Sequence, residues 1–191
     1  MTRRVVLLAA AALALAACQQ DPRGEVATGP GAVPALALRC APYVGETPPS
    51  VPGATTVGAA EVRSWVRSSS ADPRRPVLID VAGGTTDGSE RRTVPGAVWL
   101  PGAGVCDREA PQMQKRFEDR VAALTGNDRS RPVVVWCANK ECWLSYNAAI
   151  RLARAGYSDV RWFRDGNAGW REIREAFVPV DTGWVTVQAA R

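Results

Sequence analysis

Residues 132–156, PVVVWCANKECWLSYNAAIRLARAG, combine a short apolar run with a longer amphipathic segment. Residues 132–136 contain no polar side chain, which is typical of a strand buried on both faces of a parallel sheet. Cys137 follows directly, and after a short loop the apolar residues return at helical spacing. These apolar residues are Leu144, Ala148, Leu152 and Ala155, and Gly156 is a typical helix stop. The stretch therefore predicts a strand–loop–helix unit.

The same alternation extends to both sides of this unit. A short apolar run predicts a strand at residues 76–81, and further strands are predicted at residues 55–57, 97–100 and 159–163. Helices are predicted from the spacing of three apolar sets, namely Val62, Trp65 and Val66, then Met113, Phe117, Val121 and Leu124, then Trp170, Ile173 and Phe177. Because such alternation builds parallel sheets covered on both faces, we expect an α/β, doubly wound domain with a central, mainly parallel sheet flanked by helices.

The first residues have the pattern of an export signal. Arg3 and Arg4 precede residues 5–17, which lack polar side chains but are too short for the roughly 20 helical residues that span a bilayer core. The end of this run, residues 15–18 (LAAC), resembles a lipobox. We therefore expect a signal peptide over residues 1–17, lipidation of Cys18 and an exported lipoprotein facing the periplasm. By resemblance to known sorting patterns, Gln19 favours the outer membrane; cleavage after Ala16, with Cys18 incidental, is the alternative.

Residues 18–54 are predicted to be a Pro/Gly-rich tether from the lipidated cysteine to a domain at residues 55–191. The stretch holds seven of the 14 prolines and little apolar periodicity. Cys40 lies within it, so part of the tether is a candidate for attachment to the domain. Once Cys18 is assigned to lipidation and Cys137 and Cys142 to a candidate site, Cys40 and Cys106 remain. They are expected to pair as a structural disulfide, although either could instead be free.

Composition excludes several classes of function. The chain has no histidine, which rules out Cys–His and Ser–His–Asp catalysis and histidine-ligated metals. Two cysteines without histidine rarely hold a metal, so we expect neither a metal nor a cofactor. Of the formal charge of +5, two charges lie in the leader, and no basic run carries interleaved aromatics. We therefore expect no nucleic-acid partner.

The candidate active-site residue is Cys137, at the carboxyl end of a predicted strand, where open parallel sheets bind ligands. Loop N–H groups and the amino end of the next helix would stabilise a thiolate there. In an oxidising compartment, Cys142 is expected to form a reversible disulfide with Cys137. Asp80, at another strand end, is expected to orient backbone N–H groups. The candidate substrate- or anion-binding residues are Ala138, Asn139, Lys140, Glu141 and Trp143. A buried, inert Cys137 is the alternative.

Several segments together resemble a rhodanese-like domain over about residues 56–180. They are residues 77–81 (VLIDV), 94–98 (VPGAV), the strand–Cys–loop–helix unit, 155–160 (AGYSDV) and 165–170 (DGNAGW). Residues 94–101 (VPGAVWLP), 142–149 (CWLSYNAA) and 164–170 are similar to the exported PQQ-dependent catabolism-associated CXXCW motif family. The resemblance implies a rhodanese fold, sulfur chemistry at Cys137 and a link to a periplasmic quinoprotein dehydrogenase. The chain departs from these families in two ways. Four residues separate Cys137 from Cys142, and Lys140 and Glu141 stand where loop arginines are common.

Three functions are compatible with these residues. The first is a sulfurtransferase, in which Cys137 carries a persulfide taken from a small sulfur compound and Cys142 resolves it. The second is a thiol–disulfide oxidoreductase that exchanges with protein thiols. The third is a non-catalytic accessory protein that binds a periplasmic quinoprotein dehydrogenase. The missing loop arginines count against a sulfurtransferase, and the presence of Cys142 favours a thiol–disulfide oxidoreductase. The resemblance favours an accessory protein.

Overall fold

The computed structural model describes residues 37–72, 74–84 and 90–184. The predicted signal peptide, the lipidation site Cys18 and the tether up to residue 36 lie outside the described residues. Within them, no helix is both long and apolar enough to cross a membrane.

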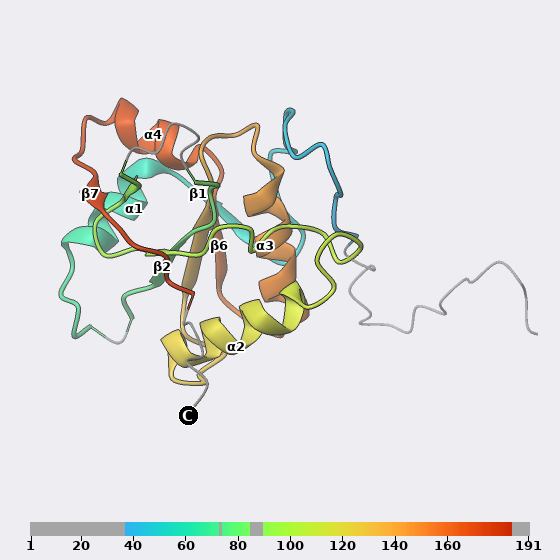
Figure 1. Cartoon of the computed structure of the whole chain (residues 1–191). Coiled ribbons are helices and arrows are strands. Elements are labelled where there is room, and N and C mark those ends of the chain that lie inside the picture. Colours follow the sequence, from blue (N-terminus) through green and yellow to red (C-terminus); the bar gives the residue numbers. More distant parts are fainter. Residues whose placement is uncertain (1–36, 73, 85–89, 185–191) are drawn as a thin grey trace, which may run out of the picture. The chain divides into compact units, whose positions relative to one another are not determined.

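A sheet forms the centre of the domain (Figure 1). It has five strands in the order β1-β6-β5-β2-β4. Its strands are β1 (Thr55–Val57), β2 (Val77–Asp80), β4 (Val98–Trp99), β5 (Val133–Trp136) and β6 (Val160–Phe163). All neighbouring strands pair in parallel. The central strands β2 and β5 are buried at every position, as the unbroken apolar runs predicted.

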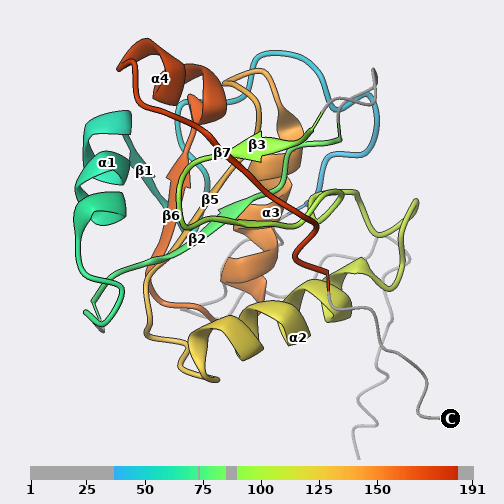
Figure 2. The same ribbon diagram turned by 60° about the vertical axis from the view of Figure 1, so that its left-hand side comes forward.

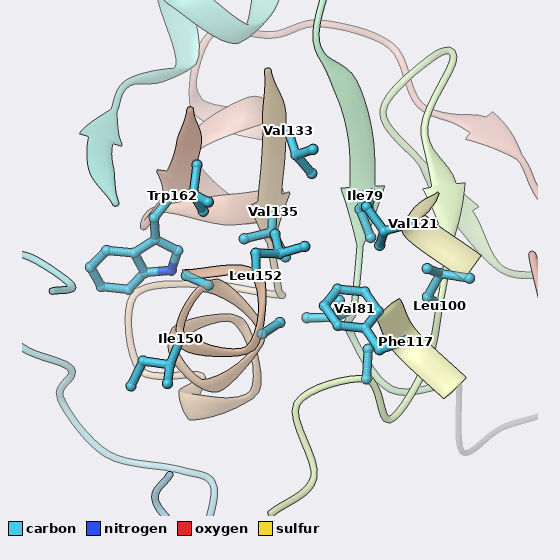
Figure 3. Close-up of a cluster of buried hydrophobic side chains, with 14 of the residues drawn as sticks. Ile79, Val81, Leu100, Phe117, Val121, Val133, Val135, Ile150, Leu152 and Trp162 are labelled. Atoms are coloured by element: carbon cyan, nitrogen blue, oxygen red, sulfur yellow. The ribbon is translucent and has the colours of Figure 1, made fainter. Parts of the chain in front are cut away.

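Helices cover both faces of the sheet (Figure 2). Helices α1 (Ala59–Arg67) and α4 (Gly166–Glu172) lie on one face, and α2 (Met113–Thr125) and α3 (Trp143–Arg154) lie on the other. Alternate residues of β5 serve the two cores: Val133 and Val135 face α2 and α3, whereas Val134 and Trp136 face α1 and α4. Figure 3 shows the core between the sheet and the α2–α3 layer. The predicted doubly wound α/β architecture is confirmed.

The carboxyl-terminal part differs from the prediction in two respects. The last helix ends at Glu172, so Ile173 and Phe177 lie beyond it. Arg174 has a φ of 57°, which turns the chain away from the helix axis. The chain then forms a small antiparallel sheet that the sequence did not indicate, between β3 (Arg92–Thr93) and β7 (Val178–Pro179). Two-residue strands are too short to show an apolar period.

The described part of the predicted tether, residues 37–54, packs against the domain. Val51 is buried in the core with α3, and a disulfide joins Cys40 to Cys106, the pairing that cysteine arithmetic favoured. The segment has no helix or strand of its own before residue 55, and main-chain groups between residues 43 and 47 bond instead to residues 140–143. The segment therefore lacks an apolar period because its main chain pairs with a loop that is distant in the sequence.

Candidate active site

The loop from Cys137 to Cys142 lies at the carboxyl end of β5 and leads into α3. Cys137 follows the last residue of the strand, and Cys142 is the N-cap of the helix. Their sulfurs form a disulfide, with the two Cα atoms 6.0 Å apart. Cys137 is 1% exposed and Cys142 is half-buried, so the bond joins a shielded sulfur to a residue nearer the surface. The structure therefore brings together the two cysteines that the sequence singled out.

Helix α4 fixes the first half of this loop. The backbone N–H of Asn167 donates to the Cys137 carbonyl at 3.0 Å, and that of Ala168 donates to the Ala138 carbonyl at 2.9 Å. Gly166, at a φ of 55°, allows this approach: a Cβ there would lie 2.1 Å from the Cys137 oxygen. The glycine is required both by its left-handed backbone and by the close packing of loop and helix.

Asp80 connects the end of β2 to the same helix. Its carboxylate is fully buried and accepts from the Ala82 N–H (2.8 Å) and the Thr93 hydroxyl (2.7 Å). Arg91 pairs with it at 2.5 Å. The Asn167 amide donates to Asp80 at 3.3 Å and accepts from the Trp136 indole at 3.0 Å. Asp80 thus orients the Ala82 N–H. Through Asn167 it also supports Trp136, the residue directly before Cys137.

Asn139 organises the second half of the loop. Its side-chain oxygen accepts from the Glu141 N–H at 3.0 Å, and its carbonyl accepts from the Cys142 N–H at 3.2 Å. The loop is curled as expected, but these two N–H groups are bonded to Asn139. They are not the free anion donors that the sequence analysis anticipated.

A pocket of about 120 Å³ lies beside the loop and is acidic. Its lining residues are Asn139, Lys140, Glu141, Asp165, Ala168, Gly169 and Glu172. Three carboxylates against one ammonium disfavour a small anion in this pocket. The neighbouring Trp143 is half-buried, because the Arg39 guanidinium lies 4.3 Å from its ring centroid and the Tyr146 ring packs at 5.0 Å. Trp162 and Trp170 are buried packing residues.

Comparison with known proteins agrees with this geometry. The family profile described as "Rhodanese-like domain" matches residues 60–173, more than half of the chain. The chain belongs to the rhodanese-like domain family.

Two solved structures illustrate what the chain is similar to. A rhodanese-like domain from Anabaena sp. is 19% identical, with a TM-score of 0.46, 71% of this chain covered and 86% of that one. A thiosulfate sulfurtransferase from Pseudomonas aeruginosa is 24% identical, with a TM-score of 0.46, 68% of this chain covered and 21% of that one. No curated protein sequence matches significantly.

In this rhodanese-like domain, the candidate active-site loop also contacts the amino-terminal segment. The Trp143 N–H donates to the Tyr43 carbonyl at 2.9 Å, and the Gly45 N–H donates to the Glu141 carbonyl at 3.0 Å. Thr47 donates to the Lys140 carbonyl through its N–H (3.2 Å) and its hydroxyl (2.5 Å). Sequence reasoning missed Tyr43 and Thr47, because nothing local marks a residue whose partner is about a hundred positions away.

The Cys40–Cys106 disulfide has its own polar surroundings. Glu109 accepts from the Ala41 N–H at 3.0 Å and from the Tyr43 hydroxyl at 2.9 Å. The N–H of Ala41, followed by the Tyr43 hydroxyl, lowers the pKa of Glu109. Burial raises the pKa of Tyr43, although its hydroxyl accepts from the Cys106 N–H at 2.9 Å. These bonds fix the segment on either side of residue 42 to residues 106–109, which precede α2.

Proposed function

We propose that this rhodanese-like domain carries out thiol-based sulfur chemistry, in which Cys137 accepts a sulfur atom and Cys142 resolves the persulfide. The observation that carries the proposal is the Cys137–Cys142 disulfide across the loop at the carboxyl end of β5. A cysteine at a strand end beside a helix amino terminus is in a suitable place for a nucleophilic thiolate. The second cysteine, at the N-cap of α3, is within bonding reach without any movement of the helix.

The reaction starts from the reduced pair and a persulfide donor, R–S–SH. The Cys137 thiolate attacks the outer sulfur, the donor S–S bond breaks, R–S⁻ leaves and Cys137 becomes a persulfide. The Cys142 thiolate then attacks the inner sulfur, which forms the Cys137–Cys142 disulfide and releases HS⁻. Two external thiols, R′–SH, reduce that disulfide and leave as R′–S–S–R′. The observed Cys137–Cys142 disulfide supports this proposal, because the second step would form that bond.

The acidic pocket bears on the choice of donor. Glu141, Asp165 and Glu172 line the space beside the loop, with Lys140 as the single basic residue there. A doubly charged anion such as thiosulfate is repelled from this side, whereas a neutral or protein-bound persulfide is not. The same observation favours thiol–disulfide exchange with a partner's cysteines as the second candidate function, because that reaction needs no small anion.

Variants of the two cysteines test the proposal. The purified full chain is reduced, freed of reductant and treated with a persulfide donor, and peptide masses and released sulfide are measured. Cys142→Ser is expected to retain one extra sulfur on Cys137, removable by cyanide, and to release no sulfide. Cys137→Ser is the matched control, and it should neither retain an extra sulfur nor release sulfide. A Cys142→Ser protein that never gains sulfur on Cys137 would leave thiol–disulfide exchange as the better account.

We also propose that the chain is an exported lipoprotein of the PQQ-dependent catabolism-associated CXXCW type, facing the periplasm. The leader, the lipobox-like residues 15–18 and the resemblance of residues 94–101, 142–149 and 164–170 support this proposal. Two disulfides among the described residues agree with an oxidising compartment. Cys18→Ala should prevent labelling by a fatty-acid probe and move the protein from the membrane to the soluble fraction. Unchanged labelling would contradict lipidation of Cys18.

The resemblance further suggests a periplasmic quinoprotein dehydrogenase as the protein partner. One alternative role follows from it, in which the rhodanese-like domain binds the dehydrogenase without chemistry of its own. Cys137→Ser separates the two roles in cells that depend on such a dehydrogenase. Loss of dehydrogenase-dependent growth, with a normal amount of the variant protein, supports a chemical role. Full growth supports an accessory binding protein.

A further inference from the structure

Residues 39–47, called the strap below, run across the second half of the active-site loop. Val44 forms an antiparallel bridge with Cys142 itself. Three main-chain hydrogen bonds, donated by Gly45, Thr47 and Trp143, join strap and loop at distances of 2.9–3.2 Å. The carbonyls of Lys140 and Glu141, next to the resolving cysteine, are therefore held by residues far away in the chain.

The Thr47 side chain is the central contact between strap and loop. Thr47 is 2% exposed, and its hydroxyl donates to the Lys140 carbonyl at 2.5 Å. The same oxygen accepts from Arg164 Nε at 3.2 Å, while Arg164 Nη2 donates to the Thr47 carbonyl at 2.6 Å. Arg164 directly follows β6, so the hydroxyl connects a sheet strand to the loop.

The strap is anchored at both ends. Arg164 holds it at Thr47, and the Cys40–Cys106 disulfide holds it near Cys40. Directly before Cys40, Arg39 donates its N–H to the buried Asn147 side chain of α3, and between the two anchors the Tyr43 hydroxyl donates to Glu109. With both ends fixed, residues 43–47 have little freedom to leave the loop.

We propose that the strap positions Cys142 for its bond to Cys137, with Thr47 as the positioning residue, and that the Cys40–Cys106 disulfide keeps the strap in place for this task. The inference rests on the reversible Cys137–Cys142 disulfide of the proposed function, but not on sulfur transfer. While the strap is bound, residues 140–142 are held in the closed loop, which raises the effective concentration of Cys142 at Cys137. Freeing the strap gives the loop more freedom and favours the dithiol over the disulfide.

Two substitutions at one position test the role of Thr47. Thr47→Val keeps the shape and removes the hydroxyl, whereas Thr47→Ser keeps the hydroxyl. The ratio of Cys137–Cys142 disulfide to dithiol is measured in glutathione buffers by peptide mapping of the full chain. Thr47→Val should lower this ratio by about threefold to tenfold, the worth of one net hydrogen bond. Thr47→Ser should stay within about twofold of the wild type. A merely structural role would lower the melting temperature of Thr47→Val and leave the ratio unchanged, which would overturn the proposal.

A double-mutant cycle tests the part played by the second disulfide. Cys40→Ser with Cys106→Ser should lower the ratio in the same direction, and adding Thr47→Val should then have a smaller effect than in the wild type. Equal effects of Thr47→Val with and without the Cys40–Cys106 disulfide would show that this disulfide does not act through the strap. If the double serine variant does not fold, the Val and Ser comparison at residue 47 still decides the matter. If the wild-type Cys137–Cys142 bond resists reduction altogether, the proposed function fails, a result distinct from an unchanged ratio in Thr47→Val.

Discussion

Gly166→Ala probes the contact between α4 and the candidate active-site loop. The substitution places a Cβ 2.1 Å from the Cys137 oxygen and 2.9 Å from its carbonyl carbon, both of which are backbone atoms that cannot rotate away. The left-handed backbone, with a φ of 55°, costs an alanine about 1 kcal/mol. Forcing the loop and the helix apart adds about 1–3 kcal/mol. The expected loss of stability is therefore about 2–4 kcal/mol, or roughly 5–15 °C in melting temperature for a chain of this size.

Gly126→Ala is the matched control for this prediction. Gly126, the C-cap of α2, has a φ of 67°, and a Cβ there would meet nothing within 4 Å. Its substitution carries the backbone cost of about 1 kcal/mol without the steric one. Urea denaturation of both variants, with both disulfides oxidised, gives the two free energies of unfolding. If Gly166→Ala loses no more stability than Gly126→Ala, the loop does not pack on α4 as described, and the account of how Cys137 is held is wrong.

Three further substitutions follow from the polar contacts. Asp80→Ala leaves the Arg91 guanidinium without its buried partner and should cost about 3–5 kcal/mol in urea denaturation; a loss below about 1 kcal/mol would refute the structural role of Asp80. Lys115→Ala removes an exposed ion pair to Asp119 and should lower the free energy of unfolding by less than about 0.5 kcal/mol in the same assay. A larger loss would contradict the view that this ion pair adds little stability. Glu109→Gln should weaken protection of the Ala41 N–H in hydrogen exchange at neutral pH. Since the pKa of Glu109 is lowered from its ordinary 4.5, this stabilisation is present above pH 4.5 and disappears as the pH falls through the lowered pKa. A difference between wild type and Glu109→Gln that persists in strong acid would contradict that origin.

The sequence predicted the elements whose own residues carry the signal. The unbroken apolar run before Cys137 predicted β5, and the helical spacing after Cys142 predicted α3, each within one residue of its observed bounds. The position of Cys137 at a strand end followed from the same run. The fold class, and the places of Cys137 and Cys142 at the two ends of one loop, could therefore be predicted from local patterns alone.

Contacts between distant residues could not be predicted in this way. Thr47 and Arg164 are separated by 117 positions, and neither has an apolar or spacing pattern that indicates the other. The same holds for Gly166, whose need to be glycine comes from the Cys137 carbonyl and not from its neighbours in the chain. Residues 43–47 were interpreted as part of a tether because a strap whose partners lie elsewhere has the composition of a loop.

The most direct test of sulfur chemistry at Cys137 and Cys142 is a stoichiometry on the wild-type chain. The reduced protein is mixed with a persulfide donor, and released sulfide is counted against newly formed Cys137–Cys142 disulfide in one peptide map. Sulfur transfer through the two cysteines predicts one sulfide for each disulfide, because Cys142 displaces HS⁻ from the Cys137 persulfide. Disulfide that forms without sulfide, or sulfide released while both thiols stay reduced, would contradict it.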